Sequence, residues 1–162
     1  MVALGTAAGT HTVALLTDMN TPLGRTAGNA LEVAESVEVL AGGGPADVVE
    51  LTVALAVEML AGVGITDVDP AAALADGRAM DVWRRMISAQ GGDPDAALPV
   101  AAETHVVNAP SSGVLSRLDA YAVGVAAWRL GAGRARKEDA VSAGAGVVML
   151  SLIHISEPTR PY

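Results

Sequence analysis

One stretch, residues 17–36, constrains the fold of this chain more than any other. It reads TDMNTPLGRTAGNALEVAES and follows a short apolar run, TVALL, over residues 12–16. The run is typical of a buried strand, which we expect over residues 10–17. Asp, Asn, Pro and two Gly then predict an irregular loop up to residue 28, because these residues favour turns. Apolar residues at helical spacing predict a helix from Asn29, a possible cap, to about Leu40.

The rest of the chain continues with alternating signals. Residues 2–9 are typical of the end of a helix that closes at Gly9. Further helices are expected over 47–60, from Asp69-Pro70, over 77–90, and after Asp119 as a cap. Further strands are expected over 104–107, over 113–118 and from Gly146 to Met149. Helices alternating with strands predict an α/β fold class.

Composition excludes several classes of function. The net charge is -8, so a polyanionic nucleic-acid partner is not expected. The chain has no cysteine, which excludes disulfides and thiolate chemistry. No apolar run reaches membrane length and no signal peptide is apparent, so we expect no membrane association and a cytoplasmic location.

The loop and the helix after it suggest one kind of site. Glu32, Glu35 and Glu38 recur every third residue, which for Glu32 and Glu38 indicates a solvated helix face. Glu35 lies within two turns of a loop whose carbonyls are not all paired by secondary structure. Carbonyls and one carboxylate form an oxygen cage that suits a hard cation. A surface charge beside a structural turn remains the alternative for Glu35.

Four segments carry a resemblance to a known family. They are LLTDMNTPLGRTAGNALEVAESVEVLAGGGPADVVEL (15–51), GRAMDVWRRMISAQGGD (77–93), SGVLSRLDAYAVGVAAWRLGAGRARKED (112–139) and GAGVVML (144–150). Together these segments resemble the thymidine and pyrimidine-nucleoside phosphorylases, over essentially all of residues 1–149. The resemblance implies part of the large α/β domain of such an enzyme, a mixed sheet with flanking helices that is incomplete at both ends.

The resemblance also implies a reaction and a cofactor. Family members are cytoplasmic homodimers that cleave thymidine or uridine with phosphate, giving the base and (deoxy)ribose 1-phosphate. In potassium-binding members the matching loop and helix hold the ion. Carried over, the ligands are the carbonyls of Leu23 and Thr26 and the side chain of Glu35. Thr26 stands where a small apolar residue is expected, a change that leaves the carbonyl in place.

Two further expectations concern the activity of the isolated chain and the nature of its C-terminal tail. The family's residues for phosphate, base and sugar lie upstream of it, so we expect no catalytic residue in this fragment and no activity of the isolated chain. The tail LSLIHISEPTR, residues 150–160, is identical to a translated sequencing adapter. We therefore interpret residues 1–149 as a partial domain and residues 150–162 as a non-native tail, with a natural tail containing an edge strand at 151–155 as the alternative.

Two alternatives to a thymidine or pyrimidine-nucleoside phosphorylase are considered. One is a non-catalytic half-protein that pairs structurally with another chain. The other is a sibling enzyme such as an AMP phosphorylase, against which the form of the TDMN loop argues.

Overall fold

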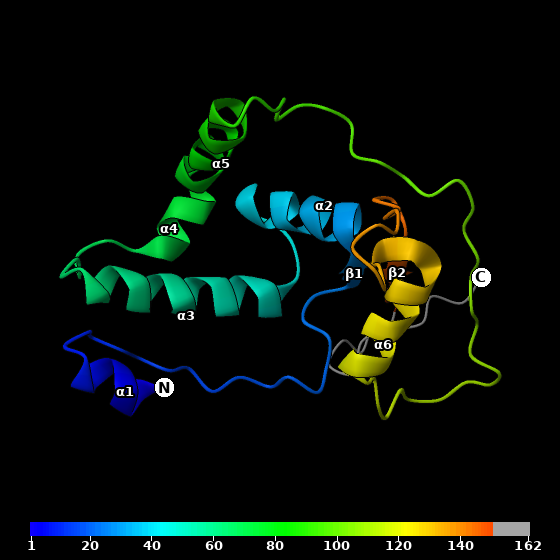
Figure 1. Ribbon diagram of the computed structural model, residues 1–162, viewed down its shortest axis with the longest axis horizontal. Coiled ribbons are helices and arrows are strands. Elements are labelled where there is room, and N and C mark those ends of the chain that lie inside the picture. Colours follow the sequence, from blue (N-terminus) through cyan, green and yellow to red (C-terminus); the bar gives the residue numbers. More distant parts are fainter. Residues whose placement is uncertain (151–162) are drawn as a thin grey trace. The chain divides into compact units, whose positions relative to one another are not determined.

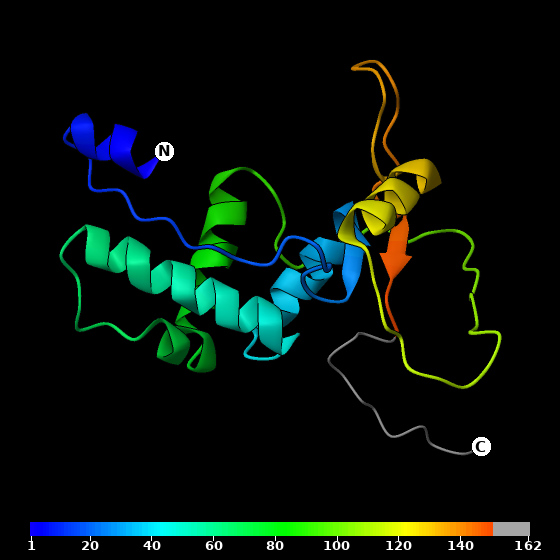
Figure 2. The same cartoon turned by 90° about the horizontal axis from the view of Figure 1, so that it is seen from below.

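The computed structural model describes residues 1–150, which form two compact units. The first unit comprises residues 1–18 and 38–94. The second comprises residues 19–37 and, within the described part of the chain, residues 95–150. Figures 1 and 2 show the elements of each unit in two views.

The first unit is helical. Its helices are α1 (Val2–Ala7), α3 (Ala46–Gly62), α4 (Pro70–Ala75) and α5 (Arg78–Ala89). Helix α4 contacts both α3 and α5. Asp69 caps α4, because its carboxylate accepts a hydrogen bond of 2.9 Å from the backbone N–H of Ala71. Val39, Pro45 and Leu74 are buried in this unit.

The second unit is built on a small antiparallel ribbon. Its elements are β1 (Thr26–Gly28), most of α2 (Asn29–Leu40), α6 (Ala120–Ala127), the π-helical turn η1 (Trp128–Ala132) and β2 (Gly146–Val148). The strands pair in the register Thr26 with Val148 and Gly28 with Gly146. Gly28 and Gly146 let the two backbones approach closely, because a Cβ on either one would collide with the opposite strand.

Helix α6 packs against both strands of this ribbon, as Figures 1 and 2 show. Asp119 caps α6, because its carboxylate accepts the backbone N–H of Ala122 at 2.9 Å. The core between these elements consists of small side chains and one larger one: Ala30, Ala127, Ala145 and Met149. Because alanines bury little area, hydrogen bonds between the segments have to fix much of the geometry of this unit.

The expected α/β class is confirmed, as are the helices over 29–40, 47–60 and 77–90 to within a residue or two, and the strand at Gly146. The expected strands over 10–17, 104–107 and 113–118 are wrong, because these residues run without regular structure. An alternating or apolar pattern specifies which side chains can be buried, but a strand forms only where a neighbour completes its hydrogen bonds. Val107 and Val114 are instead 87% and 91% exposed.

Within the described residues the sheet is an antiparallel pair of strands, and the mixed sheet that the resemblance implies is not seen there. The tail interpreted as non-native, and the alternative edge strand at 151–155, lie outside the described residues except for Leu150. None of the helices in residues 1–150 has both the length and the apolar character of a membrane span.

Candidate cation site

The loop before β1 is anchored at both ends by backbone hydrogen bonds. The carbonyl of Asn20 accepts the N–H of Ala120, the first residue of α6, at 2.8 Å. The carbonyl of Arg25 accepts the N–H of Met149, just after β2, at 2.8 Å. Both partners are about a hundred or more residues away in sequence. The loop that carries Leu23 is therefore held by elements from the far end of the described chain.

Glu35 reaches back from α2 to this loop. Its Oε1 accepts a hydrogen bond of 2.9 Å from the backbone N–H of Arg25. Glu35 is half-buried, whereas Glu32 and Glu38 on the same helix are exposed. Since Arg25 lies between Leu23 and Thr26, the Glu35 carboxylate is positioned beside the segment that carries both expected carbonyl ligands.

Glu32 makes a second contact of the same kind, which the sequence reasoning missed. Its Oε1 accepts the backbone N–H of Gly28 at 2.9 Å. The sequence shows a signal for this contact, because a glutamate in the first turn of a helix often returns to a backbone N–H at the helix start. Glu32 is therefore exposed and also holds the last residue of β1, Gly28, through this hydrogen bond.

The strand register fixes which way the Thr26 carbonyl points. The bond from the Met149 N–H to the Arg25 carbonyl brackets the opposed residues Thr26 and Val148. In an antiparallel pair, residues bracketed in this way do not exchange hydrogen bonds with each other. The N–H and carbonyl of Thr26 therefore face the outer edge of β1, away from β2. The Gly28 N–H, two residues on, faces the same edge and meets Glu32 there.

Leu23 lies at the turn that leads into this edge. The next residue, Gly24, is buried and has a positive φ of 70°. Only glycine adopts this left-handed conformation without steric cost, so Gly24 allows the chain to reverse between Leu23 and Arg25. The Leu23 side chain is half exposed, at 49%.

The expected donor set has the chemistry that a hard monovalent cation prefers. It consists of two backbone carbonyls and a carboxylate, all oxygen ligands, and a carboxylate has acceptor sites beyond the one that the Arg25 N–H uses. The side-chain hydroxyl of Thr26 is buried and has no hydrogen-bond partner among the described residues. The structure brings Glu35 to the loop, and the assignment of Leu23, Thr26 and Glu35 as potassium ligands stays a prediction.

Long-range hydrogen bonds also complete the start of α2. The Asn29 side-chain amide donates to the carbonyl of Ala132 at 2.8 Å, and the Ala30 N–H donates to the carbonyl of Ala143 at 2.9 Å. The first N–H groups of a helix have no partner inside it, so the Ala143 carbonyl satisfies one of them. Asn29, expected as a cap, is the first residue of the helix and links it to η1.

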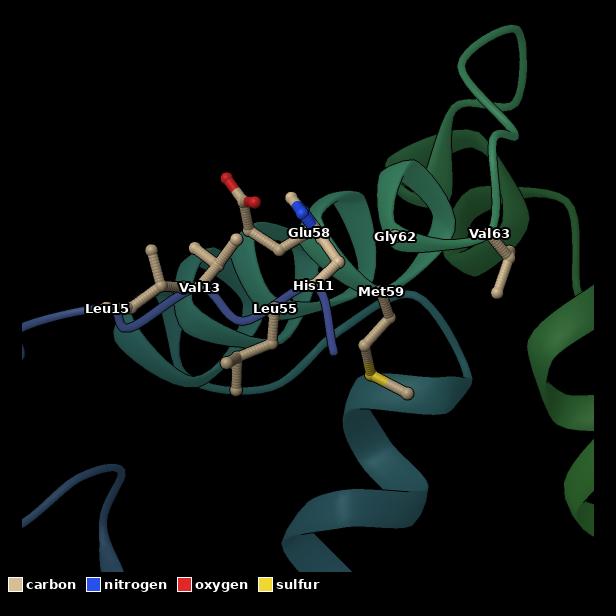
Figure 3. A pocket seen from close by; sticks show the side chains of 8 residues that line it. All are labelled: His11, Val13, Leu15, Leu55, Glu58, Met59, Gly62 and Val63. Carbon is tan, nitrogen blue, oxygen red and sulfur yellow. The ribbon is translucent and has the colours of Figure 1, made fainter. Parts of the chain in front are cut away.

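A separate cavity of about 340 Å³ lies in the first unit. Figure 3 shows the segment with His11, Val13 and Leu15 running along α3, which contributes most of the other lining residues. The lining is mostly apolar, with His11 and Glu58 as its titratable residues. In residues 1–150 no three His, Asp or Glu side chains are grouped so that they could hold a metal ion. The cavity shares no residue with the candidate cation site.

Comparison with known proteins relates the chain to the nucleoside phosphorylases. Residues 114–154 match the family described as pyrimidine nucleoside phosphorylase C-terminal domain. The chain is 60% identical over 147 residues to the thymidine phosphorylase of Mycobacterium tuberculosis. It is 38% identical over 160 residues to the pyrimidine-nucleoside phosphorylase of Bacillus subtilis, and 37% identical to that of Staphylococcus haemolyticus. The resemblance to the thymidine and pyrimidine-nucleoside phosphorylases is confirmed.

The extent of these matches matters for function. The alignments cover 91% or 92% of this chain but only 34% to 37% of the relatives. The chain thus spans about a third of the length of the curated relatives it matches. The family match also extends over residues 150–154, so the interpretation of 150–162 as a non-native tail remains a prediction.

Proposed function

We propose that this chain is part of a phosphorylase that acts on pyrimidine nucleosides, with thymidine as the first substrate to test. In the reaction, phosphate forms a bond to the anomeric carbon of the sugar while the bond from that carbon to the base breaks. Thymidine and phosphate thus give thymine and 2-deoxyribose 1-phosphate, and the reaction is reversible. The names of the relatives support this activity, and the 60% identity favours the thymidine phosphorylases among them.

The 60% identity to a thymidine phosphorylase carries the proposed activity, and the contact between Glu35 and the Arg25 N–H supports a cation site within it. Through this contact Glu35 holds the loop and is not simply a solvated charge. We propose that three residues contribute ligands for potassium: Leu23 and Thr26 through their carbonyls, and Glu35 through its carboxylate. A bound potassium ion would supply a fixed positive charge that holds the ligating segments together.

The chain's own residues have a supporting role in this proposal. Glu35 and Glu32 fix the backbone of residues 25–28, and the Asn20 and Arg25 carbonyls tie this backbone to α6 and β2. A backbone held in this way presents its carbonyls without further reorganisation, which is what a selective cation site requires. The groups that contact phosphate, sugar and base in the family fall outside the matched region, so we propose that residues 1–162 alone do not turn over thymidine.

A chimeric enzyme tests the function. Residues 1–149 would replace the matching third of the M. tuberculosis thymidine phosphorylase, and release of thymine from thymidine would be followed with and without phosphate. We expect phosphate-dependent release of thymine and 2-deoxyribose 1-phosphate by the chimera and none by the 162-residue chain. A chimera that is folded but inactive would contradict the proposal, and turnover by the 162-residue chain would contradict its expected inactivity.

Assembly is tested with the same chimera. We further propose a cytoplasmic homodimer, supported by the resemblance to the family. Light scattering coupled to size-exclusion chromatography checks the dimer, and a monomeric active chimera would exclude it.

A further inference from the structure

Two backbone hydrogen bonds close the part of the loop that carries Leu23. The Asn20 carbonyl accepts the N–H of Ala120 at the start of α6, and the Arg25 carbonyl accepts the N–H of Met149 after β2, both at 2.8 Å. Leu23 lies between the two bonded carbonyls in the chain. The position of the Leu23 carbonyl is therefore linked to the docking of α6 and of the residue after β2.

The link from Asn20 to Leu23 has little slack. Pro22 stands within it, and its ring fixes its own φ near about −65° and restricts Thr21 before it to extended conformations. On the other side of Leu23, the buried Gly24 has a left-handed φ of 70°. Because the connecting residues have few alternative conformations, a displacement of Asn20 is passed on to Leu23.

The N–H of Ala120 is available to the loop because α6 does not use it. Ala120 is the first residue of the helix, where an N–H group has no partner inside the helix. The Asp119 carboxylate caps the helix by accepting the N–H of Ala122, two residues further on. The Asn20 carbonyl thus gives the Ala120 N–H the partner that the helix and its cap leave to another segment.

We propose that potassium binding to the loop and docking of α6 onto the loop are coupled, with the Ala120 N–H as the positioning group. The proposal rests on the cation site of the proposed function and adds an element that sets the affinity of that site. With α6 docked, less of the loop remains to be ordered when the ion binds. An ion that holds the Leu23 carbonyl in turn holds Asn20 against α6. Such coupling is reciprocal, so each event favours the other by the same factor.

A proline at position 120 removes this one N–H group. The first position of a helix tolerates proline, and Asp119 has the extended conformation, with a ψ of 117°, that a residue before proline prefers. The matched control is Ala46→Pro. Ala46 is the first residue of α3 in the first unit, and it follows a residue with a similar ψ of 136°. We therefore expect Ala120→Pro to keep α6 and to lose its bond to Asn20.

The experiment follows hydrogen exchange by mass spectrometry in the 162-residue chain and in both variants. The KCl concentration would be raised while tetramethylammonium chloride holds the ionic strength constant. Peptides covering residues 20–28 and 117–124 report on the loop and on the start of α6. A peptide covering residues 69–75, which include α4, controls for general effects of salt. The measurement needs no cooperative unfolding transition.

We expect potassium to slow exchange in the loop and at the start of α6 with the same half-saturating concentration, and to leave α4 unchanged. In Ala120→Pro the loop should need about five times more potassium, a factor at the low end of coupling between sites. Ala46→Pro should match the parent chain. A purely structural role of Ala120 would instead speed exchange at every potassium concentration without moving the half-saturating one, and that result would contradict the proposal.

The outcomes separate this inference from the function beneath it. If potassium protects the loop but not the start of α6 in the parent chain, the coupling is wrong and the cation site stands. This comparison needs no variant, so it decides the matter even if Ala120→Pro does not fold. If potassium protects neither segment of the parent chain, the cation site and the coupling are both wrong, while the phosphorylase activity is judged by the chimera. An equal shift in Ala46→Pro would contradict the specific role of Ala120.

Discussion

The backbone N–H of Arg25 and the carboxylate of Glu35 are joined by a hydrogen bond of 2.9 Å that spans ten residues of the chain. A side chain two turns into α2 thereby fixes the peptide group between the two expected carbonyl ligands. The same helix fixes Gly28 through Glu32. A loop with so many turn-forming residues has many accessible conformations, and these two carboxylates select one of them.

The first prediction concerns Glu35 itself. Glu35→Gln keeps an oxygen that can accept the Arg25 N–H but removes the charge, whereas Glu35→Ala removes both. We expect Glu35→Ala to lower the free energy of unfolding by about 1 kcal/mol and Glu35→Gln by less, because a net hydrogen bond contributes on this scale. Both variants should lose potassium-dependent stabilisation. Chemical denaturation with and without potassium measures the two effects, and a Glu35→Gln variant that keeps the full potassium response would argue against Glu35 as a ligand.

The second prediction concerns Glu32. Glu32→Ala leaves the part-buried N–H of Gly28 without its acceptor, so we expect a loss of about 1–2 kcal/mol in the free energy of unfolding. The matched control is Glu38→Ala on the same helix. Glu38 is exposed near the C-terminus of α2, where a negative charge is unfavourable, so its removal should cost nothing or stabilise slightly. Equal losses in the two variants would show that helix propensity, and not the Gly28 contact, determines the effect.

The third prediction uses two neighbouring glycines after α2. A Cβ on Gly43 would lie 3.5 Å from the Glu38 Cγ, an ordinary contact, and the Gly43 N–H would keep its bond to the Glu38 carbonyl. Gly43→Ala should therefore stabilise the first unit by roughly 0.5 kcal/mol by restricting the unfolded chain.

Gly44 differs, because its φ is +81° and a Cβ there would collide with Val39. Gly44→Ala should destabilise the protein by about 1–3 kcal/mol through strain and overpacking. Urea denaturation of both variants checks the pair. If the two substitutions had the same sign, the turn over 42–44 would not have the geometry described above.

The fourth prediction concerns acid stability at the cap of α6. The N–H of Ala122 and the guanidinium of Arg117 lower the pKa of the Asp119 carboxyl below its ordinary value of 3.8. A folded-state pKa below the unfolded one gives stability that is present above the unfolded pKa and is lost as the pH falls through the folded value. Unfolding midpoints of the parent chain should therefore fall as the pH drops below about 4.

Asp119→Asn separates capping from charge. Asparagine still accepts the Ala122 N–H but does not titrate, so the variant should show a flatter pH dependence below about pH 4. Asp76 has a pKa lowered mainly by the Arg78 N–H, with help from the Arg78 guanidinium, so Asp76→Asn should flatten the dependence further and additively. An unchanged pH profile in the double variant would contradict the assigned causes.

Prediction from the sequence was most accurate for helix caps and helix bounds, which depend on interactions between near neighbours in the chain. Asp119 was expected as a cap and Asp69 at the start of a helix, and each accepts a backbone N–H of the helix that follows it. The bounds of α2 also follow from local signals, with glycines and a proline beyond Leu40. Interactions within a few residues are encoded by the residues themselves, so a single sequence suffices to find them.

The sequence failed where a structure depends on distant partners. Residues 113–118 have a strand-like pattern but no regular structure, whereas Thr26–Gly28, in a segment expected as loop, forms a strand because β2 pairs with it. The contact of Glu32 with the Gly28 N–H was also missed. The spacing of the glutamates fits a solvated helix face equally well. The resemblance implied a ligand role for Glu35, its contact with the Arg25 N–H was not predicted, and spacing alone did not distinguish Glu35 from a surface residue.

The bond between the Asn29 side chain and the Ala132 carbonyl joins residues 103 positions apart, and Arg25 meets Met149 over a still longer span. During synthesis on the ribosome, the loop and the start of α2 emerge long before these partners exist. These hydrogen bonds therefore cannot form until the residues of β2 have left the exit tunnel. The loop before β1 is therefore completed late in the synthesis of this segment.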